Sequence, residues 1–135
     1  MVFANGVFDL LHVGHVALLE QAAALGKSLV VAVNSDGSAR LLGKGADRPL
    51  VPESDRVRLV AALGCVDCVV TFDEPTPIHA IEALAPDVLV KGGDYTVATI
   101  VGADLVRQRG GRVEIVPLVP EQSTTRLVER LRASP

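Results

Sequence analysis

A short apolar strand that passes through a glycine-containing loop into a helix opens the sequence and limits how the chain can fold. The predicted strand covers residues 2–4, and the predicted helix begins near His15 and ends at Gly26. The loop between them holds Gly6, Asp9, His12, Gly14 and His15. Such a turn brings backbone N–H groups and the positive end of the helix dipole to one point, where phosphate binds readily. We therefore expect a phosphate site that carries two imidazoles.

This loop does not match the two common phosphate-binding motifs. Neither G-x-G-x-x-G nor G-x-x-x-x-G-K-[ST] is present around His12-Val13-Gly14-His15. Gly14 leaves room for a ligand oxygen to approach the backbone. Two histidines at a phosphate site suit nucleotidyl transfer, because imidazole N–H groups stabilise the charge on the phosphoryl oxygens without a covalent intermediate. The alternative is that one histidine only caps the helix or fills space.

Strands and helices alternate along the rest of the chain. Further strands are predicted at 29–33, 66–72, 87–91 and 113–116, and helices at 52–63, 78–84, 97–109 and after Ser123. Residues 34–37 are predicted as a turn and 39–50 as a basic loop. Short connections between alternating elements favour one Rossmann-like α/β domain over residues 1–135, with five parallel strands and helices on both faces. Ligands of such sheets bind beyond the carboxyl ends of the strands.

The composition narrows the class of partner. A net charge of −3 and 3% aromatic residues provide neither a basic groove nor stacking platforms for nucleic acid. The hydrophobic fraction is 49%, but no apolar run approaches twenty residues, so a membrane span is not expected. With a strand at the very N-terminus, we expect a cytoplasmic protein. Cys65 and Cys68 are expected to be packed side chains rather than a redox or metal pair.

The residues N-G-V-F-D-L-L-H-V-G-H at 5–15 resemble the signature of the HxGH nucleotidylyltransferases, in their cytidylyltransferase-like branch. V-N-S-D at 33–36, V-K-G-G-D-Y at 90–95 and S-T-T at 123–125 look most like the heptose 1-phosphate adenylyltransferases of ADP-heptose synthesis. The similarity covers nearly the whole chain. It implies transfer of AMP from ATP to a sugar 1-phosphate, D-glycero-D-manno-heptose 1-phosphate, with Mg²⁺ as cofactor. Related enzymes are often dimers, so we also expect a homodimer, and the composition predicts that it binds neither nucleic acid nor membrane.

The resemblance assigns roles to individual residues. The catalytic residues are His12, His15 and Lys44. Nucleotide binding is expected from Gly6, Val7, Phe8, His12, Gly14, His15, Lys91, Gly92, Asp94, Ser123, Thr124 and Thr125. Substrate binding is expected from Asn5, Asp9, Asp36 and Arg56, with Arg56 facing either phosphate or solvent. The candidate metal contacts are Asp9, Asp36 and Asp94, whereas the role of Arg48 stays open.

Two other functions remain open at this point. One is a CTP-dependent enzyme that acts on glycerol 3-phosphate or another polyol phosphate, and the other is a non-catalytic nucleotide-binding module. Gln122 replaces the residue expected before S-T-T in the adenylyltransferases. The bifunctional relatives carry a sugar kinase domain ahead of this one, so we expect a separate protein to make the acceptor phosphate.

Overall fold

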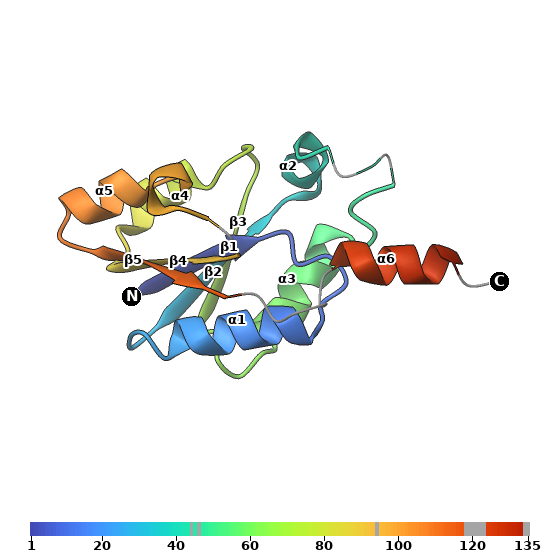
Figure 1. Cartoon of the computed structure of the whole chain (residues 1–135), viewed down its shortest axis with the longest axis horizontal. Coiled ribbons are helices and arrows are strands. Elements are labelled where there is room, and N and C mark those ends of the chain that lie inside the picture. The colour runs from blue at the N-terminus through green and yellow to red at the C-terminus, as the bar shows by residue number, and fades with distance from the viewer. Residues whose placement is uncertain (44, 46, 94, 118–123, 134–135) are drawn as a thin grey trace.

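A five-stranded sheet forms the centre of the computed structural model, which describes residues 1–43, 45, 47–93, 95–117 and 124–133 (Figure 1). All strand pairs are parallel, and the strand order is β3-β2-β1-β4-β5. The strands are β1 (Val2–Gly6), β2 (Leu29–Asn34), β3 (Cys68–Phe72), β4 (Val88–Gly92) and β5 (Arg112–Val116). The helices are α1 (Val13–Ala23), α2 (Asp36–Leu41), α3 (Glu53–Ala61), α4 (Ile78–Leu84), the 3₁₀ turn η1 (Val97–Thr99), α5 (Ala103–Gln108) and α6 (Thr124–Ala133). The predicted parallel α/β fold is confirmed.

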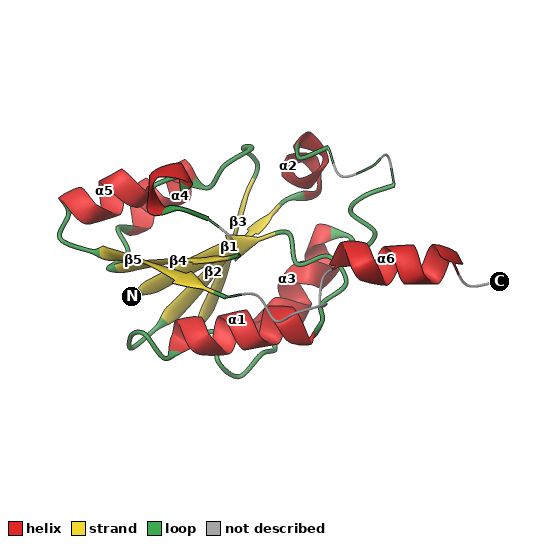
Figure 2. Ribbon diagram, in the orientation of Figure 1, coloured by secondary structure: helices red, strands yellow, loops and turns green. Residues whose placement is uncertain are grey.

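Helices cover both faces of the sheet (Figure 2). On one face, α1 and α3 bury Leu19 and Val60 against the strands. On the other face, Ile81 of α4 and Val106 of α5 pack over Phe3 of β1. Because β2 is buried along its whole length, its sequence is a continuous apolar run rather than an alternating one.

The order of the strands reverses between β1 and β4. From β1 the chain moves outward through β2 to the edge strand β3, then returns to β4 on the other side of β1. In open parallel sheets, ligands bind at the carboxyl edge beside such a switch in strand order. In Figure 1 that edge faces right, where α1 begins and α6 lies. The fold therefore places the predicted site loop, residues 7–12, at the switch point.

Two predictions of local structure were wrong. Residues 34–37 are not a simple turn, because Ser35 caps the short helix α2 by accepting a hydrogen bond from the backbone N–H of Ser38 at 3.1 Å. The helix predicted at 97–109 is divided into η1 and α5. Gly102 lies between them with φ of +86°, a conformation that ends a right-handed helix, and its backbone lies close against Ile81.

The cysteine prediction holds for one of the two residues. Cys65 is half-buried beside the core under α3, and burial raises the pKa of its thiol. Cys68 is exposed, because it begins the edge strand β3, so its prediction as a packed side chain was wrong. No helix in the described part of the chain is long and apolar enough to cross a bilayer.

Candidate active site

The loop between β1 and α1 has an unusual backbone. Phe8 and Leu10 adopt left-handed conformations, with φ of +54° and +49°. Residues other than glycine rarely do so, and the surrounding contacts must stabilise them there. Phe8 is buried, and its ring meets the imidazole of His15 edge-on with centroids 5.3 Å apart. Phe8 in this strained loop therefore packs against His15 and helps to fix the position of its imidazole.

His12 and His15 lie together at the N-terminus of α1. Their rings stack with centroids 3.8 Å apart and an interplanar angle of 25°. His12 is the N-cap, and its Nδ1 accepts a hydrogen bond from the backbone N–H of Gly14 at 3.0 Å. His15 Nδ1 accepts one from the backbone N–H of His12 at 3.1 Å. An imidazole nitrogen that accepts a hydrogen bond carries no proton, so each neutral ring holds its proton on Nε2.

The first turn of α1 favours an anion. It contains no acidic residue, and its backbone N–H groups stand at the positive end of the helix dipole. Burial lowers the pKa of His12, which keeps that imidazole neutral at neutral pH. Two neutral Nε2–H donors beside a helix N-terminus can stabilise negative charge that develops on a phosphoryl group.

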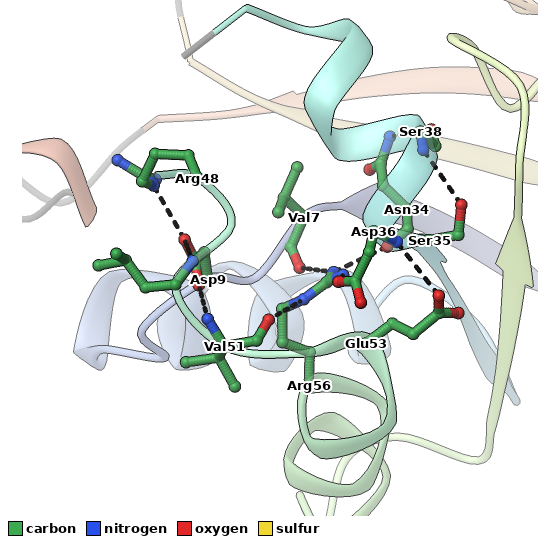
Figure 3. Close-up of polar contacts among 11 residues, drawn as sticks. Val7, Asp9, Asn34, Ser35, Asp36, Ser38, Arg48, Val51, Glu53 and Arg56 are labelled. Carbon is green, nitrogen blue, oxygen red and sulfur yellow. Dashed lines mark hydrogen bonds and ion pairs between the residues drawn. The ribbon is translucent and has the colours of Figure 1, made fainter. Parts of the chain in front are cut away.

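Arg56 is placed differently from its prediction. Its side chain is fully buried, so it faces neither phosphate nor solvent. All three of its nitrogens donate hydrogen bonds: Nε to the carbonyl of Val51, Nη1 to the carbonyls of Val7 and Asn34, and Nη2 to the carboxylate of Asp36, at 2.7–2.9 Å (Figure 3). Arg56 therefore joins the ends of β1 and β2 to the segment before α3, which explains its burial.

Asp9 is also turned inward. Its side chain is 1% exposed, and its carboxylate accepts three hydrogen bonds at 2.9 Å (Figure 3). The donors are Nε of Arg48 and the backbone N–H groups of Leu50 and Val51. A carboxylate that is buried and fully engaged offers no surface to a substrate or a metal ion. The Asp9 carboxylate is therefore bonded within the protein, and its predicted contact with the substrate or the metal stays a prediction.

Asn34 is the last residue of β2, and Asp36 is the first residue of α2. The side chain of Asp36 is 26% exposed, and its carboxylate accepts a hydrogen bond from Nη2 of Arg56 (Figure 3). The backbone N–H of Asp36 donates to the carboxylate of Glu53, which extends the same network. The pKa of Asp36 is lowered despite the opposing effect of burial, because Arg56 stabilises the carboxylate. The amide of Asn34 is buried and donates to the hydroxyl of Ser38. These contacts fix the edge of the sheet beside the site.

A cavity of about 440 Å³ opens at the carboxyl ends of β1, β2 and β4. Four predicted site residues line it: Asn5, predicted to bind the substrate, and Gly6, Val7 and Lys91, predicted to bind the nucleotide. Its volume is within the range of sites for small molecules. The ammonium of Lys91 lies 5.1 Å from the centre of the Tyr95 ring at the wall of this cavity.

Several residues of the cavity had not been predicted. They come from the end of β2, the loop before α4 and the segment around η1: Asn34, Leu42, Pro75, Thr76, Pro77, Tyr95, Thr99, Ile100 and Val101. Asn34 and Tyr95 stand within the quoted segments V-N-S-D and V-K-G-G-D-Y, but no role was assigned to them. No motif marks the others, because the loops that carry them are brought together only by the sheet. Their positions after the carboxyl ends of strands were the one signal in the sequence.

Of the remaining predicted residues, three are described by the structure and three are not. Gly92 ends β4 and pairs in register with Val116, so it lies at the same edge as the cavity. Thr124 begins α6 and donates its hydroxyl hydrogen to the backbone carbonyl of Asp9, while Thr125 is exposed on the next position of the helix. Lys44, Asp94 and Ser123 lie outside the described residues.

The arrangement of acidic side chains bears on the expected metal ion. Among the residues that the structure describes, no group of three or more His, Cys, Asp or Glu side chains could hold a metal ion. Asp9 is engaged elsewhere, and Asp36 keeps partial exposure. Mg²⁺ is commonly held by few carboxylates together with waters and substrate phosphates, so this donor set fits a cation that a triphosphate brings with it.

Comparison with known proteins places the chain among nucleotide-transferring proteins. Residues 3–130 match the family described as cytidylyltransferase-like. The D-beta-D-heptose 1-phosphate adenylyltransferase of Bordetella bronchiseptica is 55% identical over 132 residues, which is 98% of this chain and 82% of that protein. The bifunctional protein HldE of Syntrophotalea carbinolica is 56% identical over 131 residues. This chain spans only about a quarter of the length of HldE (26%).

Solved structures agree on the architecture. The lipopolysaccharide core biosynthesis protein of Thermoplasma volcanium superposes with a TM-score of 0.70 at 32% identity, covering 90% of this chain and 97% of that one. Pantothenate synthetase of Thermus thermophilus superposes with a TM-score of 0.60 at 20% identity, covering 89% and 56%. The second likeness is one of fold alone.

Proposed function

Because the chain belongs to the cytidylyltransferase-like family, we propose that it transfers an adenylyl group from ATP to D-glycero-D-manno-heptose 1-phosphate. An oxygen of the sugar phosphate forms a bond to the α-phosphorus of ATP. The bond from that phosphorus to the bridging oxygen of the β-phosphate breaks, and pyrophosphate leaves with the electron pair. The products are ADP-heptose and pyrophosphate.

One observation carries the choice of substrates. The relative from Bordetella bronchiseptica, named as a D-beta-D-heptose 1-phosphate adenylyltransferase, is 55% identical over 98% of this chain. The match spans 82% of that protein, so it is not confined to one shared motif. Identity of this extent supports the same pair of substrates for this chain.

The phosphates of ATP are assigned to the N-terminus of α1. His12 and His15 direct Nε2–H donors from this turn, and charge on the phosphoryl oxygens rises as the new bond forms. Donors fixed in advance by backbone hydrogen bonds stabilise that charge at little reorganisation cost. A second helix N-terminus, that of α6 at Thr124, lies against the same loop through the carbonyl of Asp9. It is suited to the other end of the triphosphate.

The sugar phosphate is assigned to the cavity beside β1 and β4. Its volume of about 440 Å³ accommodates a seven-carbon sugar phosphate. Asn5, Thr76 and Thr99 supply an amide and hydroxyls for the sugar, and Lys91, predicted from the sequence to bind the nucleotide, supplies positive charge. Asn5 and Gly6 belong to the strand that leads directly into the histidine loop, so the acceptor phosphate would lie close to the nucleotide.

Mg²⁺ is part of the proposal. When bound, it neutralises charge on the triphosphate and so assists departure of pyrophosphate. Asp36 is a carboxylate at this edge that remains partly exposed. The chain itself contributes orientation through the histidine turn and the cavity.

The test is pyrophosphate release with ATP, CTP, GTP and UTP, each paired with heptose 1-phosphate and glycerol 3-phosphate. The proposal predicts release only with ATP and the heptose phosphate, or at least about a tenfold preference for them in kcat/KM, equivalent to about 1.4 kcal/mol. Preference for CTP or for glycerol 3-phosphate would replace the substrates and keep the reaction type. Nucleotide binding without release in any pair would indicate a non-catalytic module.

A further inference from the structure

The carboxylate of Asp9 joins two segments that are far apart in the sequence. Its three hydrogen-bond donors belong to residues 39 to 42 positions later: the guanidinium of Arg48 and the backbone N–H groups of Leu50 and Val51. The pair is buried, with side-chain exposures of 1% for Asp9 and 9% for Arg48. An isolated charge at such a depth is strongly unfavourable, so each member depends on the other.

Asp9 also lies at the centre of the histidine loop. It stands between the two residues with left-handed backbones, Phe8 and Leu10, and three positions before the N-cap His12. Its backbone carbonyl accepts a hydrogen bond from the hydroxyl of Thr124, the first residue of α6. One residue therefore contacts the segment 48–51 through its side chain and α6 through its main chain.

A second contact joins α6 to the segment that carries Arg48. Arg132, in the last turn of α6, pairs with Asp47, which directly precedes Arg48. This pair is exposed and contributes little by itself. It nevertheless shows that the last turn of α6 contacts this segment at Asp47, so α6 does not contact the histidine loop alone. The histidine loop, the segment 47–51 and α6 thus contact one another pairwise.

We propose that Asp9 and Arg48 are positioning residues for the nucleotide, an inference that rests on the proposed function. Their ion pair fixes the segment 48–51 against the loop that carries His12, while Asp9 holds the N-terminus of α6 at the same point. The phosphate groups of ATP are assigned to the N-termini of α1 and α6, and Asp9 lies in the loop that leads into α1 and contacts α6. Affinity for ATP therefore depends on the pair.

The cavity assigned to the sugar phosphate does not involve the Asp9–Arg48 ion pair. Its cavity is lined by residues from the ends of β1, β2 and β4 and from the segment around η1, and neither Asp9 nor Arg48 is among them. Loss of the ion pair consequently affects the nucleotide far more than the sugar phosphate. This split distinguishes positioning from a general loss of stability, which would weaken both ligands.

Matched variants test the proposal in the full chain. Asp9→Asn and Arg48→Gln remove one charge each, and Asp55→Asn and Arg58→Gln make the same changes at exposed positions of α3. Calorimetry measures binding of ATP with Mg²⁺ and, separately, of the heptose 1-phosphate. Amide hydrogen exchange is followed in the ligand-free protein at Leu50 and Val51, with Val31 of β2 as the internal reference. Should Asp9→Asn fail to fold, Arg48→Gln still gives the answer, because it keeps the Asp9 carboxylate and removes only its charged partner.

We expect both variants to bind ATP at least about tenfold more weakly, with sugar-phosphate affinity within about twofold and the control variants unchanged. Exchange at Leu50 and Val51 should accelerate while Val31 stays protected. Unchanged ATP affinity would overturn the proposal, as would equal acceleration at Val31. If the wild-type protein releases no pyrophosphate but the ATP and exchange results hold, the proposed reaction fails and the positioning role stands.

Discussion

His12 and His15 stack with ring centroids 3.8 Å apart, and the backbone of the same helical turn fixes both rings. Each Nδ1 accepts a backbone N–H, so the proton of each neutral imidazole lies on Nε2. The arrangement caps the helix and is compatible with the proposed role of the histidines in orienting the ligand. The choice between a capping and a functional histidine, which the sequence leaves open, is therefore not an exclusive one.

Replacing His15 by alanine removes one donor from the phosphoryl group. We expect turnover to fall by about 10²-fold or more, the scale measured when one donor to a developing oxyanion is lost, while ATP affinity changes much less. Steady-state kinetics and calorimetry measure the two quantities. His79→Ala, at an exposed position on α4, is the matched control and should keep full activity. Equal losses in turnover and affinity would assign His15 a role in ground-state binding only.

The pH dependence follows from His12. Burial lowers the pKa of His12 below its ordinary value of 6.5. The unfolded chain then binds the proton at higher pH than the folded one, so the contribution to stability is complete above pH 6.5 and is lost as the pH falls below it. Protonation at Nδ1 also competes with the hydrogen bond from Gly14. We expect the acid limb of kcat/KM to lie below pH 6.5, whereas activity that increases on acidification would contradict a neutral donor.

The substitution Gly6→Ala tests whether the ring of Phe8 positions His15. A Cβ at this position would lie 3.1 Å from Cε2 of Phe8, closer than ordinary packing allows. The ring of Phe8 would have to shift against His15, so Gly6→Ala should reduce kcat by about tenfold through misplacement of the imidazole. Gly64→Ala is the control, because no atom lies within 4 Å of its added Cβ. An unchanged kcat in Gly6→Ala would show that Phe8 does not position His15.

Arg56 should matter for stability. In Arg56→Met, the buried carbonyl of Asn34 and the partly buried carbonyls of Val7 and Val51 lose their donor. An unsatisfied buried group costs about 1–3 kcal/mol, so the free energy of unfolding should fall by at least about 2 kcal/mol. Urea denaturation measures the change. The exposed Arg58→Met should stay within about 0.5 kcal/mol of the wild type. Similar values for both variants would show that the network contributes no stability.

Removal of divalent metal should abolish turnover. A triphosphate brings about four negative charges to a chain that is itself acidic, with a net charge of −3, and Mg²⁺ compensates them. Pyrophosphate release is measured in excess chelator and again after Mg²⁺ is restored. Full activity in the chelator would remove the metal from the proposal.

The sheet was predictable because its signal is local. The run Leu29–Val33 is apolar throughout, as a strand covered on both faces must be, and β2 follows it closely. The short helix α2 was missed because its cap, Ser35, stands in a stretch that also reads as a turn. The division of 97–109 depends on the close approach of Gly102 to Ile81, a tertiary contact that propensity does not reveal.

In the site, too, the features that depend on local sequence were predictable, and those that depend on tertiary contacts were not. The position of His12 and His15 at a helix N-terminus follows from the strand, loop and helix pattern. The inward orientation of Asp9 and Arg56 does not, because most of their partners are backbone groups of distant segments. Nearly every residue type can supply such a backbone partner, so no sequence pattern identifies it.

The most direct test of adenylyl transfer follows the phosphorus atoms of ATP. The protein is incubated with heptose 1-phosphate and Mg²⁺, together with ATP labelled at the α-phosphate in one reaction and at the γ-phosphate in another. The account predicts that the α-label appears in the sugar nucleotide and the γ-label in pyrophosphate. Transfer of the γ-label to the sugar, or no label in any sugar product, would contradict it.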